Sequence, residues 1–170
     1  KGSYLAEEPP YDPETIQGGF FPSTPAPTFA TQIAEVAVDS ETGRIDVLWV
    51  AAAHDVGFTI NPVTVEGQIE GGAVMGVGYG LSEEIAFDKG RHISLKLADY
   101  KVPTAMDAPP VEALPVEERA EGGPFGAKGV GEPGATPTAP AIANAVFSAT
   151  GVRVKELPIT PERLYWALRE

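Results

Sequence analysis

The spacing of apolar and polar residues predicts two β-hairpins. Residues 32–39 alternate roughly between the two classes, and 44–53 form an apolar run rich in β-forming side chains. The sequence Ser-Glu-Thr-Gly at 40–43 has the chemistry of a turn, so the two runs are predicted to pair across a loop of about four residues. A second hairpin is predicted for strands 84–87 and 92–97, which flank the turn sequence Asp-Lys-Gly.

Three segments carry the start and stop signals of helices. The first, 63–81, follows Asn61-Pro62, in which a capping side chain precedes a proline at the first helical position. The second, 138–150, has apolar residues on one face and a glycine just past its end. After a brief strand within 152–157, a threonine, a proline and an acid open a last helix over 160–168.

Proline is concentrated in two stretches, which are therefore predicted to lack helices and interior strands. Residues 1–30 contain six prolines interleaved with aromatic residues, which predicts an extended arm lying against another surface. Residues 103–140 are also rich in proline, and 103–137 is predicted to be a long loop region belonging to an active site. The elements together predict an α+β fold of two β-hairpins, a glycine-rich helix and two C-terminal helices.

The glycines of the first helix predict one smooth face, because Gly72, Gly76 and Gly80 are spaced four residues apart. An interior glycine costs a helix about 1 kcal/mol relative to alanine. Such a face is therefore favoured only where another backbone or a ligand comes very close. The helix does not span a membrane, because Glu66 and Glu70 leave an uncharged run of only 11 residues where about 20 are needed.

Charge and composition exclude several classes of function. The 170 residues include 24 Asp and Glu against 12 Lys and Arg, a net charge of −12, which argues against nucleic acid or an anionic membrane as a partner. The chain has no cysteine, and its two histidines, His54 and His92, lack the spacing of metal ligands, so we predict no metal ligand and expect structural roles for both. The composition favours a cytoplasmic protein. A chain that begins Lys-Gly-Ser is expected to be a piece of something larger.

The loop 125–134 contains the chemistry of most interest. Its Gly-Val-Gly-Glu-Pro-Gly segment matches the glycine spacing of a dinucleotide-binding turn, but a polar stretch precedes it and a carboxylate inside the turn would repel a pyrophosphate. Pro133 holds Glu132 in extended backbone, which suits either a general base on a fixed support or an ordinary solvated turn carboxylate. Lys128 either orients the loop or lies near an anion. Gln68, if buried, has an amide that can donate and accept at a polar ligand.

Five motifs follow one another in a fixed order along the chain. They are Val65-Glu66-Gly67-Gln68-Ile69-Glu70-Gly71-Gly72 after Asn61-Pro62, Asp99-Tyr100-Lys101-Val102-Pro103-Thr104, Phe125-Gly126-Ala127-Lys128-Gly129-Val130-Gly131-Glu132-Pro133, Ala139-Pro140-Ala141-Ile142-Ala143-Asn144-Ala145 and Leu157-Pro158-Ile159-Thr160-Pro161. In this order they resemble the C-terminal end of the molybdenum-binding large subunit of the xanthine dehydrogenase/aldehyde oxidoreductase family. The resemblance covers nearly the whole chain but only the last part of that subunit, so 1–170 is expected to be the C-terminal portion of a molybdopterin-binding domain.

The resemblance implies a catalytic role for Glu132. As general base, it would take the proton from a molybdenum-bound hydroxyl, whose oxygen attacks an electrophilic carbon of a heterocycle or aldehyde while hydride passes to the Mo=S group. The resemblance also implies a molybdenum–molybdopterin cofactor, in the cytosine dinucleotide form usual in bacteria, packed against the glycine face of the first helix. The residues it assigns to the cofactor are Gln68, Gly71, Gly72, Lys128, Gly129, Val130 and Gly131.

The resemblance further implies that this chain holds only half of the site. The family's upstream Gln-x-x-Phe-Gly-Gly loop and further pterin-binding segments are absent, so the expected partners are the remainder of the large subunit, chains carrying FAD and [2Fe-2S] clusters, and a small-molecule substrate. Carbon monoxide dehydrogenase-like and aromatic thioester reductase-like members share these motifs and are alternatives. A non-catalytic scaffold or assembly fragment is another.

Overall fold

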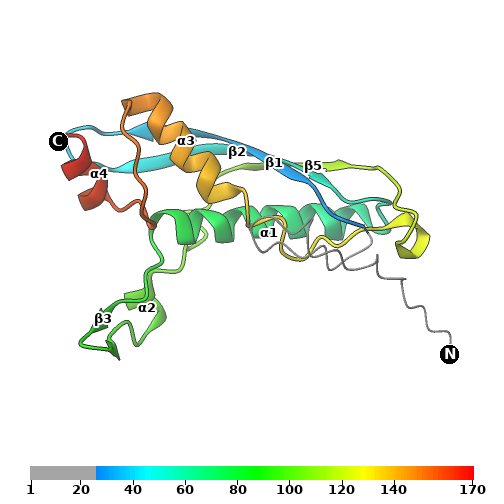
Figure 1. The fold of residues 1–170 in the computed structure, drawn as a ribbon, viewed down its shortest axis with the longest axis horizontal. Helices are drawn as coiled ribbons and strands as arrows, with labels where there is room; N and C mark the ends of the chain where they lie inside the picture. The colour runs from blue at the N-terminus through cyan, green and yellow to red at the C-terminus, as the bar shows by residue number, and fades with distance from the viewer. Residues whose placement is uncertain (1–25) are drawn as a thin grey trace, which may run out of the picture.

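The computed structural model describes residues 26–170, so most of the predicted arm 1–30 lies outside the described residues. These described residues form a mixed α+β fold with four helices and two small sheets (Figure 1). The elements are β1 (Ala30–Val38), β2 (Ile45–Asp55), α1 (Pro62–Leu81), β3 (Phe87–Asp88), β4 (Arg91–His92), α2 (Leu97–Tyr100), β5 (Val111–Val116), a 3-10 turn at Pro124–Gly126, α3 (Thr138–Thr150) and α4 (Pro161–Ala167).

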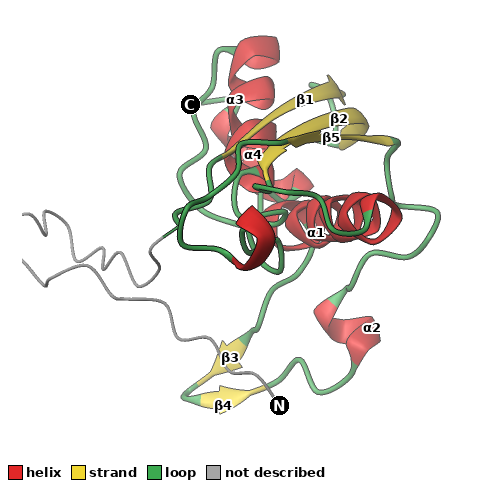
Figure 2. Ribbon diagram, turned by 90° about the vertical axis from the view of Figure 1, so that its right-hand side faces the viewer, coloured by secondary structure: helices red, strands yellow, loops and turns green. Residues whose placement is uncertain are grey.

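The larger sheet has the strand order β1-β2-β5. The predicted first hairpin is confirmed, because β1 pairs antiparallel with β2. The prediction that 103–137 lacks regular structure is wrong at Val111–Val116, because this segment pairs in parallel with β2. It forms a strand that precedes the glycine-rich loop 125–134. Pro115 is tolerated in β5 because β5 lies at an edge of the described sheet. Parallel neighbours need a crossover, and α1, which lies beneath the sheet, is part of it (Figures 1 and 2).

A one-residue bulge decides which side chains of β2 face the helices. The pairing register shifts between Glu35 and Val36, and Leu48 is the additional residue of β2. A bulge of this kind reverses the faces to which the later residues point. Before the bulge, the odd-numbered residues of β2 therefore pack inward. After the bulge, the even-numbered residues pack inward, and the last of them, His54, is fully buried. The next residue, Asp55, consequently lies on the opposite face of the strand.

The helix predictions are confirmed, together with their end signals. Asn61 caps α1 by accepting a hydrogen bond from the amide of Thr64, and α3 spans the predicted residues 138–150. Gly151 ends α3 in the left-handed conformation at φ 77°. Thr160 caps α4 in the same way that Asn61 caps α1. Because each cap satisfies backbone groups left open at a helix end, these boundaries are set locally.

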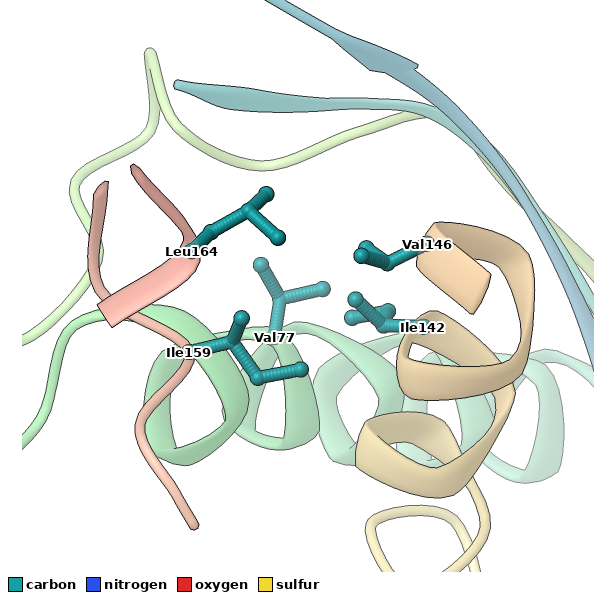
Figure 3. Packing of buried hydrophobic residues seen from close by; sticks show 5 residues of the cluster. All are labelled: Val77, Ile142, Val146, Ile159 and Leu164. Atoms are coloured by element: carbon teal, nitrogen blue, oxygen red, sulfur yellow. The ribbon is translucent and has the colours of Figure 1, made fainter. Parts of the chain in front are cut away.

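The main core lies where α1, α3 and α4 meet, together with the segment that leads into α4. Figure 3 shows Val77 of α1 facing Ile142 and Val146 of α3, with Ile159 and Leu164 completing the cluster. The inward side chains of the β1–β2 hairpin pack against the same cluster. This core fixes α1 against α3 and so sets the position of the loop that connects β5 to α3.

The smooth face of α1 is covered by the chain itself, so the expectation that a cofactor packs there is wrong. A Cβ atom at Gly72 would lie 2.7 Å from the carbonyl carbon of Gly134, and one at Gly80 would lie 3.2 Å from the Cβ of Ala139. A Cβ at Gly76 would overlap the side chain of Thr138. The bare face therefore allows close approach of the residues that lead into α3.

The remaining elements differ from prediction in extent. The second hairpin is confirmed, but β3 and β4 have only two residues each, around a turn in which Lys89 and Gly90 both have positive φ. This hairpin and α2 stand away from the sheet (Figure 2), and the flanking apolar residues, such as Ile85, Ile93 and Leu95, are exposed in the described structure. The strand predicted within 152–157 is not formed, and α2 was not predicted. In the described part of the chain, no helix is long and apolar enough to cross a bilayer.

Candidate functional site

The glycine-rich loop is attached to the segment that joins β2 to α1. The amide of Lys128 donates to the carbonyl of Val56 at 3.0 Å, and the amide of Phe58 donates to the carbonyl of Gly126 at 2.8 Å. Gly57 lies between these bonds at φ 67°, where a Cβ would overlap the carbonyl oxygen of Gly126. Glycine is required at position 57 both by its left-handed conformation and by this close approach.

A buried ion pair fixes the same part of the loop. The ammonium of Lys128 donates to the Asp55 carboxylate at 2.5 Å, and the two side chains are only 9% and 14% exposed. Because β2 turns Asp55 to the face opposite His54, the two adjacent residues serve separate contacts. The single contact with the Asp55 carboxylate matches both roles predicted for Lys128, because the ammonium lies against an anion of the chain itself and the bond orients the loop.

Replacing Lys128 by methionine is expected to lower the free energy of unfolding by about 3 kcal/mol, because it leaves the Asp55 carboxylate buried without a counter-ion. The double variant Lys128→Met/Asp55→Asn removes that charge and should recover most of the loss. Denaturant unfolding of both variants and of the wild type checks this expectation. Equal stability of the single variant and the wild type would contradict it.

The tip of the loop lies against the N-terminal half of α1. The side-chain amide of Gln68 donates to the carbonyl of Gly131 at 2.7 Å, and Thr28 donates to the carbonyl of Gly129 at 3.0 Å. The side chain of Val130, between the two glycines, packs against a second cluster of buried side chains, formed by Ala52, Val56 and Ile69. A Cβ at Gly129 or Gly131 would meet no atom of residues 26–170 within 4 Å. The outer side of the tip is therefore open backbone, which a flat ligand can approach closely.

Glu132 follows this open backbone and is exposed. Its carbonyl accepts a hydrogen bond from the amide of Ala135 at 3.0 Å, which forms a turn around Pro133. Within residues 26–170, no side chain or backbone group bonds to its carboxylate. The loop thus holds its backbone in place and leaves the carboxylate available to a ligand.

A hydrogen-bonded set of polar side chains, Gln32, His54 and Thr138, lies behind the loop, and the sequence does not predict it. The amide nitrogen of Gln32 lies 2.8 Å from the carbonyl oxygen of Gly134 and 3.2 Å from Nε2 of His54. The hydroxyl of Thr138 donates to Oε1 of Gln32 at 2.6 Å. The expectation of a satisfied structural role for His54 is only half right, because its Nδ1 has no partner among the described residues. His92, by contrast, is exposed on β4.

Acidification is expected to destabilise the fold through His54. Burial holds the pKa of His54 below its ordinary value, so the unfolded chain takes up this proton at higher pH than the folded chain. Above a pH of about 6.5 His54 is neutral in both the folded and the unfolded chain, so it does not affect stability. As the pH falls below about 6.5, the unfolded chain binds the proton first, and the free energy of unfolding decreases until the pH reaches the pKa of His54 in the folded chain. The thermal midpoint should fall across this window less in His54→Gln than in the wild type, and equal falls would contradict the assignment.

The predicted site residues divide into two groups. The structure brings Gln68, Gly129, Gly131 and Glu132 together on the exposed side of the loop, and Gly71 is exposed nearby on α1 with open space at its Cβ position. The inner group consists of Gly72, Lys128 and Val130, whose contacts are with Gly134, Asp55 and the core, respectively. Among the described residues, no group of three or more His, Cys, Asp or Glu side chains is arranged to hold a metal ion.

Comparison with known proteins agrees with the order of the motifs. Residues 1–109 match the family model of the molybdopterin cofactor-binding domain. The chain is 36% identical over 168 residues to the putative xanthine dehydrogenase molybdenum-binding subunit XdhA of Escherichia coli, covering 95% of this chain and 22% of that protein. It is 40% identical over 140 residues to the aldehyde oxidoreductase molybdenum-binding subunit PaoC of E. coli, covering 81% of this chain and 19% of that protein.

The solved structures show the same relationship. The aldehyde oxidoreductase of Desulfovibrio gigas superposes with a TM-score of 0.79 at 36% identity, covering 84% of this chain and 16% of that one. The chain spans about a fifth of the length of the curated relatives it matches. With its motifs, fold and family match in agreement, the chain belongs to the molybdopterin cofactor-binding domain of the large subunits of the xanthine dehydrogenase/aldehyde oxidoreductase family of molybdenum-containing oxidoreductases.

Proposed function

We propose that this chain forms one wall of the active site of a molybdenum hydroxylase and supplies its general base, Glu132. The single observation that supports this most strongly is the exposed Glu132 carboxylate, which has no partner among the described residues and stands on a loop attached at both ends. A carboxylate that held the loop through a specific contact would bond to a neighbouring group, and Glu132 has no such bond among the described residues. The relatives named for xanthine dehydrogenase and aldehyde oxidoreductase suggest a heterocycle or an aldehyde as substrate.

The exposed side of the loop fits a pterin cofactor. Gly129 and Gly131 leave open backbone where a flat ring can lie, and Gly71 leaves a matching space on α1. The amide of Gln68 holds Gly131 and also presents an oxygen that can accept a hydrogen bond from a ring nitrogen. When bound, the molybdenum–pterin group, in the cytosine dinucleotide form, would supply the two-electron oxidation of the substrate.

Glu132 has two tasks in this proposal. Its carboxylate takes up the proton of the attacking hydroxyl group on one of its oxygens, and it then releases that proton to solvent. General-base catalysis of this kind contributes about 10²- to 10⁴-fold to a rate when the base is held within hydrogen-bonding distance. The loop supplies the positioning, and the exposure of Glu132 gives the proton a path to water.

The other wall of the site would come from the remainder of the large subunit. This assignment is suggested by coverage, since the chain spans about a fifth of its curated relatives. Electrons would leave through [2Fe-2S] clusters and FAD on partner chains or domains. The chain would then be inactive alone and active only in the assembled enzyme.

Oxidation assays of the assembled enzyme test this proposal. The enzyme, made in cells given molybdate or tungstate, is offered an aldehyde, a nitrogen heterocycle and carbon monoxide, each with an artificial electron acceptor, and an aromatic thioester with an artificial electron donor. The proposal predicts that enzyme from cells given molybdate oxidises the aldehyde or the heterocycle, and that enzyme from cells given tungstate does not. Turnover confined to carbon monoxide or the thioester would assign the alternative chemistry, and no turnover by a molybdenum-loaded enzyme would favour a scaffold.

A further inference from the structure

The buried side chains behind the loop form a hydrogen-bonded group with one workable arrangement. The amide of Gln32 has two N–H bonds and two neighbours for them, the Gly134 carbonyl at 2.8 Å and Nε2 of His54 at 3.2 Å. Its oxygen accepts the hydroxyl of Thr138 at 2.6 Å. Turning the amide over would place its oxygen against the Gly134 oxygen, so that two acceptors would face each other.

The hydrogen bond from Gln32 also fixes the tautomer of the His54 ring. Because Gln32 donates to Nε2, this nitrogen must accept, and the proton of the neutral ring lies on Nδ1. Nδ1 has no partner within the described residues, although the side chain has no exposed surface. A buried donor without a partner is unfavourable. His54 therefore keeps one nitrogen unsatisfied while the other holds Gln32 in the orientation that binds Gly134.

We propose that Gln32 and His54 are positioning residues for Glu132. Gly134 stands two residues after Glu132, and Gly131, whose carbonyl is held by Gln68, stands one residue before it. The base is thus restrained on both sides, from α1 by Gln68 and from the sheet by Gln32. This inference rests on the proposed function for its catalytic consequence, but not for the contacts themselves.

The position of Gly134 makes this restraint effective. Gly134 lies directly against the backbone of α1 at Gly72, and Pro133 stiffens the link back to Glu132. If Gln32 no longer binds the Gly134 carbonyl, the hydroxyl of Tyr79 still holds the carbonyl of Ala135, and the close contact with Gly72 favours a shift of Gly134 away from α1. A displacement of about 1 Å at a catalytic group lowers a rate by about 100-fold.

Variants of similar shape separate this role from general packing. Gln32→Met keeps the length of the side chain and removes its donors, whereas His54→Leu removes the acceptor that orients Gln32. His54→Gln retains an acceptor and should rescue the effect of His54→Leu. Matched controls are Glu35→Gln on the exposed side of β1 and His92→Gln on β4.

The experiment measures amide hydrogen exchange over 129–136 together with kcat and KM in the assembled enzyme. Gln32→Met and His54→Leu should each speed exchange over 129–136 and lower kcat by about 100-fold with little change in KM. His54→Gln and both controls should resemble the wild type. If Gln32→Met does not assemble, Thr138→Val, which removes the hydroxyl that Gln32 accepts, should speed exchange over the same segment.

Two outcomes overturn the inference. The first is a Gln32→Met enzyme with the amide exchange and kcat of the wild type. The second is faster exchange that is spread equally over β1, β2 and α3, because that result would mean that Gln32 contributes only to packing. The two proposals fail separately. An active Glu132→Gln enzyme would refute the general base but leave the exchange result standing, whereas an inactive Glu132→Gln enzyme beside an unaffected Gln32→Met enzyme would refute only the positioning.

Discussion

Glu132→Gln is expected to lower kcat of the assembled enzyme by about two to four orders of magnitude, the range attributed to a general base. Glutamine keeps the shape of the side chain but cannot accept the proton at neutral pH. Because Glu132 is exposed and its carboxylate has no partner among the described residues, the substitution breaks no contact of the fold. Steady-state assays with matched molybdenum analysis measure the effect, and the molybdenum content should not change.

A matched control comes from Glu118, which is exposed earlier in the same connection. Glu118→Gln makes the same change of charge and should leave kcat within about twofold of the wild type, as is usual for surface substitutions away from a site. Near-wild-type turnover by a Glu132→Gln enzyme with full molybdenum content would refute the base assignment.

Gly72→Ala is expected to lower both stability and turnover. The new Cβ would lie 2.7 Å from the carbonyl carbon of Gly134 and 3.0 Å from the amide nitrogen of Ala135, so backbone rather than a flexible side chain must move. Overpacking of this kind costs about 1–3 kcal/mol. The segment that moves carries Glu132 two residues away, so kcat should fall by about 100-fold for a shift of about 1 Å. Thermal unfolding and steady-state kinetics measure the two effects.

Gly67 on the same helix provides the control for stability. A Cβ there would meet none of the described atoms within 4 Å, so Gly67→Ala should raise the free energy of unfolding by up to about 1 kcal/mol through helix propensity. The pair separates the general cost of glycine in a helix from the specific need for close approach at Gly72. A Gly72→Ala protein as stable as Gly67→Ala would contradict the packing described for α1.

The features that the sequence predicted well are those encoded locally. Asn61, Gly151 and Thr160 mark helix ends through contacts within one turn, and the sequence predicts all three. Strand β5 was missed because its pairing with β2 joins residues far apart in the chain, and Pro115 argued against a strand. The smooth glycine face was identified correctly, but its partner was not. Spacing reveals the need for close approach without showing which group approaches.

The same distinction applies to the candidate site. Glu132 and Gln68 lie in motifs that the sequence displays, whereas the bonds from Lys128 to Asp55 and from Gln32 to Gly134 span 73 and 102 residues. One signal for Gln32 was present. It is a polar residue in phase with the inward apolar positions of β1, and a polar side chain at such a position needs a partner. The bulge at Leu48 gave no comparable signal, so the inward position of His54 followed only from the structure.

The molybdenum and pterin content of the complex isolated through this chain tests the central claim most directly. The chain is purified together with the remainder of the large subunit from cells supplied with molybdate, and both are quantified against the amount of this chain. We expect a single molybdenum atom and a single pterin for each copy of this chain, with slower amide exchange over 129–132 than in the cofactor-free complex. A fully assembled complex that contains neither, or loaded complex with unchanged exchange over 129–132, would contradict it.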